Sequence, residues 1–175
     1  MRYNPLIVCA TTYCTYTDSP LCPLLLTSDG TVLTGLYMAG HTHGPEIGAS
    51  WVSDSTAEPF AEAIHQLDAY FAGMLTDFTL PLALLGTEFQ KRVWAELLLI
   101  PYGETCSYGE LARRLGSPNA SRAVGLANGR NPLSIIVPCH QVIGASGKLM
   151  GYGGGIERKA ALLALESKSL LQHAF

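Results

Sequence analysis

At 175 residues with 48% apolar content, the chain is long enough to bury a core, and disorder is excluded. No stretch approaches the roughly 20 apolar residues of a membrane span, and five cysteines without a CxxC pair argue against a disulfide framework, so we expect a cytoplasmic protein. The net charge of -3 conceals an acidic first half and a basic second half: residues 1–85 hold one basic and eight acidic residues, whereas residues 86–175 hold ten basic and six acidic ones. Because local clusters of Lys and Arg drive phosphate binding, a nucleic-acid partner stays open, with a chance fluctuation in charge as the alternative.

The first half is predicted to form a small antiparallel sheet with one helix. Asp29-Gly30 is a strong hairpin signal between two apolar runs, and residues 57–71 carry apolar side chains at helical spacing. The glycine-rich residues 40–48 predict a loop. Strands are expected over residues 6–17, 24–27 and 31–38, with another short one near 78–82. This half carries no obvious chemistry.

The second half is predicted to consist of closely spaced helices with recognisable caps. Thr87 and Gln90 have the spacing of a capping box, and so do Ser107 and Glu110. Ser117-Pro118 offers an N-cap followed by proline at the first helical position. The helices are expected from residue 88 to the Pro101-Tyr102-Gly103 stop, from 108 to about 115 with Gly116 as the C′ glycine, from 118 to 128, and from about 156 onwards.

Two short helices joined by a tight turn indicate a helix-turn-helix, with residues 118–128 as the recognition element. Arg122 is followed in this segment by mostly small residues, which permit close backbone approach but cannot read base edges in a major groove. That composition suits a shallow minor-groove contact with one long cation to insert among the bases. A small-residue helix buried against a neighbour is the open alternative.

A candidate nucleophile follows the apolar residues 133–137. Pro138 fixes the backbone before Cys139, and His140 stands next to it as a base that could generate the reactive thiolate. Because adjacent side chains rarely bond directly, a water bridging His140 and Cys139 is expected. A buried structural cysteine is the alternative reading of a lone Cys-His pair.

The motifs around Cys139 resemble those of the O6-alkylguanine-DNA alkyltransferases. The run Pro138-Cys139-His140 precedes Val142 and is similar to the family's active-site signature. Further matches in consistent order, spanning roughly residues 87–167, are Pro101-Tyr102-Gly103, Ser107-Tyr108, Ser121 to Gly125, Asn131-Pro132, Gly151-Tyr152, Gly154-Gly155 and Glu166. The resemblance implies an α/β (α+β) fold, with a ribonuclease-H-like domain over residues 1–85 and a mostly helical, winged-helix-like domain over 86–175.

The resemblance also implies a chemical role for each matching residue. Cys139 would accept the alkyl group, His140 would deprotonate it through water, and Glu166 would orient and charge the imidazole. The residues support Glu166 independently, because it shares one face of the predicted last helix with Lys159 and two leucines and needs a polar partner there. An exposed carboxylate near the chain end is the alternative.

The remaining roles concern DNA and the damaged base. Tyr108 would donate a proton or hydrogen bond to the departing guanine and crowd the phosphate, Arg122 would fill the hole left by the flipped base, and Asn131 would act as a hinge. Ordinary helix packing for Tyr108 and a plain turn for Asn131 are the alternatives. Residues expected to contact DNA are Tyr108, Arg122, Ala123, Gly125 and Ala127. Residues expected to form the substrate pocket are Pro138, Val142, Tyr152, Gly153 and Gly154, with the loop 145–154 leaving room for alkyl groups larger than methyl.

The implied partner is double-stranded DNA that carries O6-alkylguanine, or O4-alkylthymine, and the chain is expected to act once, as a monomer, with no cofactor, membrane or obligate protein partner. The family usually has arginine where this chain has Gln141, which puts loop stability in doubt. A structural zinc is not expected, since the cysteines and histidines of the first half fit no standard spacing. A helix-turn-helix regulator that does not react, or a thiol hydrolase with a Cys/His/Glu triad, would be the rival functions.

Overall fold

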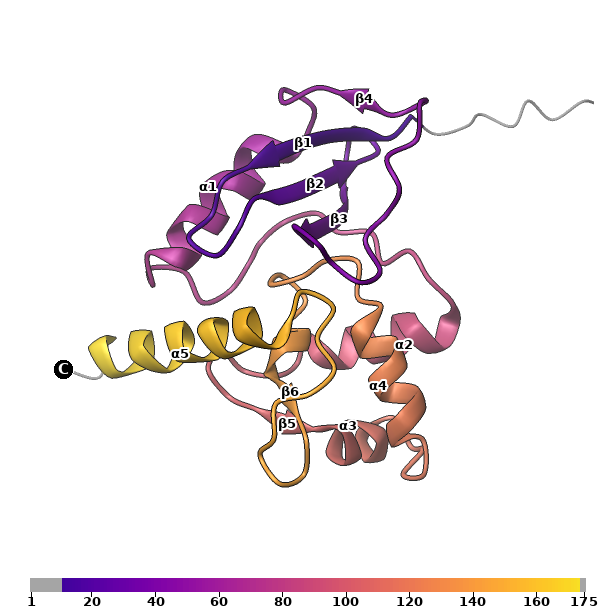
Figure 1. The fold of residues 1–175 in the computed structure, drawn as a ribbon, viewed down its shortest axis with the longest axis vertical. Coiled ribbons are helices and arrows are strands. Elements are labelled where there is room, and N and C mark those ends of the chain that lie inside the picture. Colours follow the sequence, from indigo (N-terminus) through magenta and orange to yellow (C-terminus); the bar gives the residue numbers. More distant parts are fainter. Residues whose placement is uncertain (1–10, 174–175) are drawn as a thin grey trace, which may run out of the picture.

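A four-stranded sheet and one helix form the N-terminal part of the protein (Figure 1). The computed structural model describes residues 11–173, with side chains to residue 171. The elements here are β1 (Tyr13–Thr17), β2 (Leu24–Ser28), β3 (Leu33–Met38), β4 (Val52–Ser53) and α1 (Phe60–Phe71). The strand order is β3-β2-β1-β4, antiparallel except for the parallel pair β1 and β4. The predicted hairpin and helix are confirmed, whereas residues 6–10 of the predicted first strand lie outside the described part.

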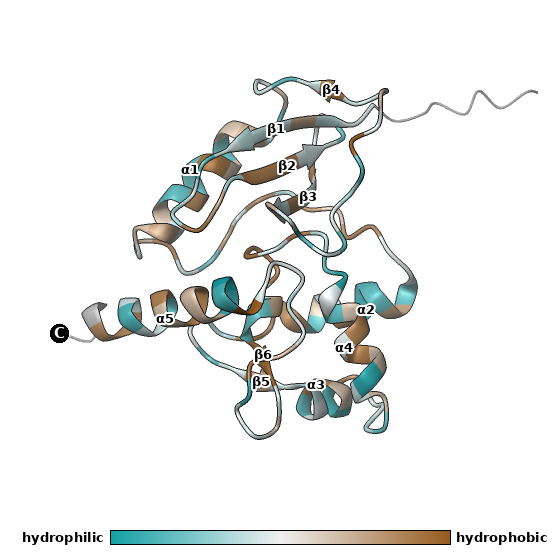
Figure 2. Ribbon diagram, in the orientation of Figure 1, coloured by the Kyte–Doolittle hydropathy of each residue, from teal (hydrophilic) through white to brown (hydrophobic). Residues whose placement is uncertain are grey.

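The sheet forms because β2 is buried along its whole length, and Figure 2 shows it among the most hydrophobic segments. The turn after β2 is stabilised by the Asp29 carboxylate, which accepts from the backbone N–H groups of Thr31 and Val32. The strand predicted near residues 78–82 is wrong, since only an isolated bridge between Leu33 and Leu82 forms there. Pro81 lacks the N–H that a longer ladder needs, and only its carbonyl pairs with β3.

The C-terminal part is mostly helical. Its elements are α2 (Glu88–Leu97), β5 (Cys106–Ser107), α3 (Tyr108–Arg114), α4 (Ser121–Gly129), the 3-10 turn η1 (Cys139–Gln141), β6 (Val142–Ile143) and α5 (Ile156–His173). Both predicted capping boxes are present at α2 and α3. Gly116 has the predicted left-handed conformation, with φ 71°. The mixed α/β class is therefore confirmed, with α3 and α4 as the helix-turn-helix pair.

The predicted start of the recognition helix is wrong by three residues. Ser117 does not cap a helix at Pro118, because its carbonyl accepts from the N–H of Ala120 and closes a separate turn. The helix begins at Ser121, after Ala120 as the N-cap residue. The proline therefore belongs to the turn between α3 and α4, where its fixed φ is equally favourable.

The two parts are joined by backbone pairing as well as by side-chain packing. The N–H of Leu36 in β3 donates to the carbonyl of Pro132 (2.8 Å), and the N–H of Ser134 donates back to Leu36 (2.9 Å). Residues 132–134 thus run beside the edge strand β3 and carry the chain towards Cys139. Within residues 11–173, none of the helices has the length and apolar character needed to cross a bilayer.

Candidate active site

Two tight turns bring the backbone to Cys139. The N–H of Ile136 donates to the carbonyl of Ser134 (2.8 Å), and the N–H of Cys139 donates to the carbonyl of Val137 (2.7 Å). Ile135, at the centre of the first turn, has φ 70° and is the one non-glycine residue with positive φ in the described chain. A β-branched residue in that region costs on the order of 1–3 kcal/mol, so the surrounding contacts must hold the turn in place.

The Asn131 side chain is the contact that holds these turns and the thiol together. Its Nδ2 donates to the carbonyl of Val137 (2.8 Å) and lies 3.0 Å from Cys139 Sγ. Its Oδ1 accepts from the N–H of Leu133 (3.0 Å), and the side chain is 1% exposed. Asn131 therefore fixes the sulfur and the backbone before it, a more direct role than that of a hinge.

The Cys139 thiol lies in a low-dielectric environment. The residue is 2% exposed, and burial raises the pKa of its thiol to about 11, although the Asn131 amide and the positive charge of Lys159 oppose that rise. At neutral pH an isolated thiol of this kind is almost entirely protonated. Nucleophilic chemistry at Cys139 therefore requires a base that removes the proton.

His140 and Glu166 form a buried pair beside the thiol. His140 Nε2 and Glu166 Oε1 are 2.6 Å apart, and both residues are almost fully buried. Tyr70 of α1 also donates to Oε1 (2.7 Å). Burial by itself would raise the pKa of Glu166, but the hydrogen bonds and charge of His140, together with Tyr70 and Gln141, place that pKa below its ordinary value. The carboxylate is therefore charged, and it can stabilise an imidazolium.

The other nitrogen of His140, Nδ1, is buried and has no hydrogen-bond partner among the described side chains and backbone. The hydrogen bond to Glu166 favours the tautomer with hydrogen on Nε2. In that tautomer Nδ1 has a free lone pair. His140 is therefore arranged as a base whose accepting atom is Nδ1.

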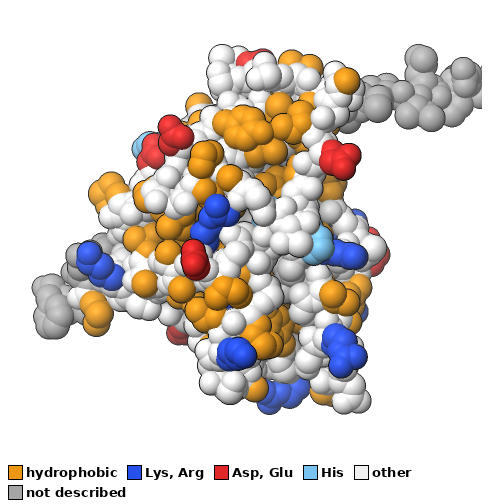
Figure 3. All heavy atoms as spheres, viewed as in Figure 1, with side chains coloured by type: hydrophobic (Ala, Val, Ile, Leu, Met, Phe, Trp, Pro, Cys, Tyr) orange, Lys and Arg blue, Asp and Glu red, His pale blue; other side chains and the backbone are white. Residues whose placement is uncertain are grey.

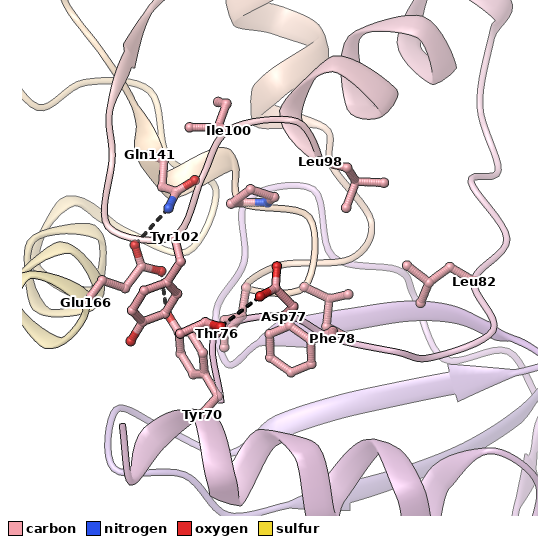
Figure 4. A pocket seen from close by; sticks show the side chains of 13 residues that line it. Tyr70, Thr76, Asp77, Phe78, Leu82, Leu98, Ile100, Tyr102, Gln141 and Glu166 are labelled. Carbon is pink, nitrogen blue, oxygen red and sulfur yellow. Dashed lines mark hydrogen bonds between the residues drawn. The ribbon is translucent and has the colours of Figure 1, made fainter. Parts of the chain in front are cut away.

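Gln141 replaces the usual arginine and supports Glu166 without adding charge. Its Nε2 donates to Glu166 Oε2 (2.9 Å) and to the carbonyl of Pro101 (3.1 Å). Figure 4 shows this bond beside a cavity of about 130 Å³, bordered by Tyr70 and Tyr102. Pro138, predicted for the substrate pocket, borders the same cavity. The substitution therefore keeps the carboxylate braced.

Lys159 is a buried cation near Cys139 that the sequence interpretation did not include in the site. It is fully buried on α5, and its Nζ donates to the carbonyls of Val142 and Met150, the latter at 2.8 Å. Burial lowers the pKa of Lys159 to about 8, whereas the Cys139 thiolate raises it. The signal was available, since Lys159 shares the apolar face of α5 with Glu166 and a buried cation needs partners.

Tyr108 is the first residue of α3, and the Ser107 capping box sets its position. Its hydroxyl donates to the carbonyl of Met150 (3.0 Å), the same carbonyl that accepts from Lys159. Burial, followed by the nearby Cys139 charge, raises the pKa of Tyr108, so the phenol keeps its proton and remains a donor. The predicted donor thus lies at the loop that follows β6.

A pocket of about 230 Å³ lies between α4 and that loop, and we call it the α4 pocket. Its lining residues are Thr42, His43, Gly125, Leu126, Gly129, Gly151, Tyr152 and Gly153. Of the residues predicted for the substrate pocket, Tyr152 and Gly153 line the α4 pocket, whereas Val142 is fully buried and its carbonyl accepts from Lys159. Gly154, also predicted for the substrate pocket, packs against β3, because a Cβ on it would meet Met38 and Tyr152.

The exposed face of α4 carries Arg122 and Ala123, as predicted for a DNA contact. Ala127 was predicted on the same face, but it is 3% exposed and its carbonyl accepts from the Trp94 indole of α2 (2.9 Å). Packing on α2 therefore turns Ala127 inward, and Leu126, 64% exposed, takes its place on the outer face. On the face shown in Figure 3, Lys and Arg side chains lie over or beside the C-terminal part.

The histidines and cysteines considered as zinc ligands do not converge within residues 11–171, where no group of three His, Cys, Asp or Glu side chains could hold a metal ion. His41 and His43 instead contact each other, with ring centroids 6.5 Å apart. Cys9 lies outside the described residues.

The fold and the site together define a helix-turn-helix protein with a buried cysteine next to a His–Glu pair, and comparison with known proteins identifies the family. Residues 88–168 match the model described as "6-O-methylguanine DNA methyltransferase, DNA binding domain", and residues 12–84 match its "ribonuclease-like domain". The chain belongs to the methylated-DNA--protein-cysteine methyltransferase family.

Individual relatives cover almost the entire chain. A methylated-DNA--protein-cysteine methyltransferase of Mycobacterium leprae is 58% identical over 91% of this chain and 94% of its own length. The crystal structure of Mycobacterium tuberculosis OGT in complex with DNA has a TM-score of 0.85 and 58% identity, covering 90% of this chain and 94% of that one. The O6-methylguanine-DNA methyltransferase of Pyrococcus kodakaraensis has a TM-score of 0.60 at 28% identity, over 89% and 99% of the two chains.

Proposed function

We propose that this protein repairs duplex DNA by transferring the alkyl group of O6-alkylguanine to Cys139, once per chain. The observation that carries the proposal is the buried His140–Glu166 pair, 2.6 Å apart, next to a thiol that Asn131 holds at 3.0 Å. A thiol with its pKa raised to about 11 needs such a base. Family membership supports the same reaction.

In the proposed reaction, His140 Nδ1 takes the Cys139 proton through a bridging water, and Glu166 stabilises the resulting imidazolium. The thiolate attacks the alkyl carbon, so an S–C bond forms as the C–O6 bond breaks. The electron pair of the broken bond goes to guanine. The thioether has no attacking group to cleave it, and the protein is therefore consumed.

The departing guanine gains its proton from Tyr108. This role is supported by the protonated state of the phenol and by its hydrogen bond to Met150, in the loop that follows β6. Tyr108 is then reprotonated by the proton that left Cys139. A donor aimed at the developing charge lowers the barrier to displacement. The positive charge of Lys159 lowers the pKa of Cys139 and so stabilises the thiolate before attack.

The proposed DNA contact uses the outer face of α4. O6 of a stacked base is out of reach of a sulfur that is 2% exposed, so the nucleotide must be extruded. Arg122 is exposed at the start of α4 and would replace the flipped base in the stack, while Ala123 and Gly125 allow close approach to the minor groove. The α4 pocket, with Tyr152 and Gly153, would receive the base.

The test is intact-mass measurement after incubation with a duplex that contains O6-methylguanine. We expect a gain of one methyl group, confined to the peptide with Cys139 and saturating at one per chain. Cys139→Ser should bind the duplex but gain no mass. Methyl groups removed in excess of protein would overturn the single-use reaction, and an unmodified wild-type protein that binds the duplex would favour the non-reacting regulator.

A further inference from the structure

The α4 pocket has a wall that the proposed reaction does not use. Thr42 and His43 line it, and both belong to the loop after β3 in the N-terminal part. Across the pocket lie Gly125 and Leu126 of α4. The N-terminal part therefore reaches the pocket directly, although its sequence gave no indication of chemistry.

Residues Met38 to His43, which we call the anchor segment, are hydrogen-bonded to the loop that carries Tyr152 and Gly153. The backbone N–H of Thr42 donates to the carbonyl of Gly153 (2.9 Å). Arg158 Nη1 donates both to the carbonyl of Ala39 (2.6 Å) and to that of Gly154 (3.0 Å), which ties the end of the loop to the same segment. The bonds from Thr42 to Gly153 and from Arg158 to Ala39 link residues more than 110 positions apart in the chain.

The His41 ring packs directly beneath Gly153. A Cβ placed on Gly153 would lie 2.3 Å from His41 Nε2 and 2.5 Å from Cε1, a distance at which something must move. Gly153 is not among the glycines with positive φ, so the close approach of His41, more than a left-handed backbone, disfavours a Cβ at this position. His41 is held in turn, since its Nδ1 accepts from the N–H of His43 (3.2 Å) and its ring contacts Tyr37.

We propose that the anchor segment is a positioning element for alkyl transfer, in which the Thr42 N–H and the His41 ring hold the Gly153 backbone at the lesion. This inference rests on the proposed function. Gly153 lines the pocket proposed to receive the base, and its backbone keeps the shape of that pocket only if it stays in place while the base enters. A shift of about 1 Å at a reacting group can cost on the order of 100-fold in rate. The hydrogen bond from the Thr42 N–H fixes the Gly153 carbonyl, and the His41 ring limits movement of the Gly153 Cα.

The decisive experiment uses the full chain and combines a variant that creates a steric clash with a second substitution that removes the clashing side chain. Gly153→Ala, His41→Ala and the double variant are compared by the single-turnover transfer rate at saturating O6-methylguanine duplex. We expect Gly153→Ala to be slowed about tenfold or more, His41→Ala about threefold, and the double variant to return close to His41→Ala, because the space that the methyl group needs is then open. The affinity for undamaged duplex and the unfolding temperature should stay near wild type, which a general loss of structure would not allow.

A second pair of variants tests the backbone bond. Thr42→Pro removes the N–H and should slow transfer about tenfold, whereas Thr42→Val keeps the N–H and should retain at least about half of the rate. Should Thr42→Pro fail to fold, the Gly153 and His41 variants still decide. A double variant as slow as Gly153→Ala would overturn the proposal, because the methyl group would then obstruct the base itself. A Gly153→Ala variant that transfers at the wild-type rate would overturn it as well. A wild-type protein without transfer overturns the proposed function instead.

Discussion

Glu166→Gln tests the proposed base most sharply, because four donors surround this carboxylate. Oε1 accepts from His140 and Tyr70, and Oε2 accepts from Gln141 and the backbone N–H of Gly103. An amide NH2 is disfavoured on the side of Gly103, whose N–H can only donate, and of Gln141, whose Nε2 donates there while it also holds the carbonyl of Pro101. It must instead point towards His140 and Tyr70, where the hydroxyl can turn to accept and the imidazole can accept at Nε2.

That orientation leaves the protein folded but moves the His140 hydrogen to Nδ1, so the base is lost. Losing the charge-assisted hydrogen bond to the imidazole costs about 1.5–3 kcal/mol, which corresponds to roughly 10- to 150-fold in rate. The loss of rate cannot exceed about 10,000-fold, because a thiol with a pKa of about 11 is still ionised in about one chain in 10,000 at pH 7 without any base. We therefore expect a loss of about 100-fold in the single-turnover rate near neutral pH.

The assay is transfer from O6-methylguanine duplex across a pH series, with thermal unfolding as the control for folding. The deficit of Glu166→Gln should shrink as the pH rises towards 11, because hydroxide then ionises the Cys139 thiol without His140. A folded variant that reacts within about threefold of wild type at neutral pH would refute the reasoning. A deficit that stays constant with pH would also count against it, since the loss would then not lie in proton removal.

Three further predictions follow from the site. The pKa of Lys159 is about 8 in the folded protein and ordinarily 10.5, so the unfolded chain binds more protons between these two pH values. The free energy of unfolding of the wild type should therefore rise from pH 8 to 10.5 relative to that of Lys159→Met, as measured by denaturant titration. Arg122→Ala should weaken duplex binding and lower the slope of log affinity against log salt by about 1, with little effect on transfer from a free alkylated base. Asn131→Ala should lower the unfolding free energy by about 1–3 kcal/mol, because the buried N–H of Leu133 loses its acceptor, and it should slow transfer by removing the donor to Cys139 Sγ; unchanged stability and rate would exclude this double role.

The parts of the fold that local signals encode were predictable from the sequence. Capping boxes at Thr87 and Ser107, the Asp29-Gly30 turn and the apolar stripe of α5 all depend on residues a few positions apart. The errors arose where tertiary contacts decide. Ala127 looks like a surface residue in a small-residue helix, but packing on Trp94 turns it inward.

Long-range partners were the part of the site that the sequence could not supply. Tyr70 lies 96 positions from Glu166, and no local pattern indicates that it donates a hydrogen bond to that carboxylate. The same holds for Thr42 and Gly153, which meet through backbone atoms and leave no side-chain signal. Family resemblance located Cys139, His140 and Glu166, but only the structure shows what holds them.

The N-terminal part thus contacts the reaction centre from two directions, through Tyr70 at Glu166 and through the anchor segment at Gly153. Its acidic composition is consistent with this position. One basic residue against eight acidic ones repels phosphate, whereas the basic residues of the C-terminal part attract it. We expect this asymmetry to steer DNA towards the outer face of α4, while the acidic part stays off the DNA backbone. In this proposal the charge asymmetry orients the protein on DNA, and the contacts of Tyr70 with Glu166 and of Thr42 with Gly153 hold the site in place once DNA is bound.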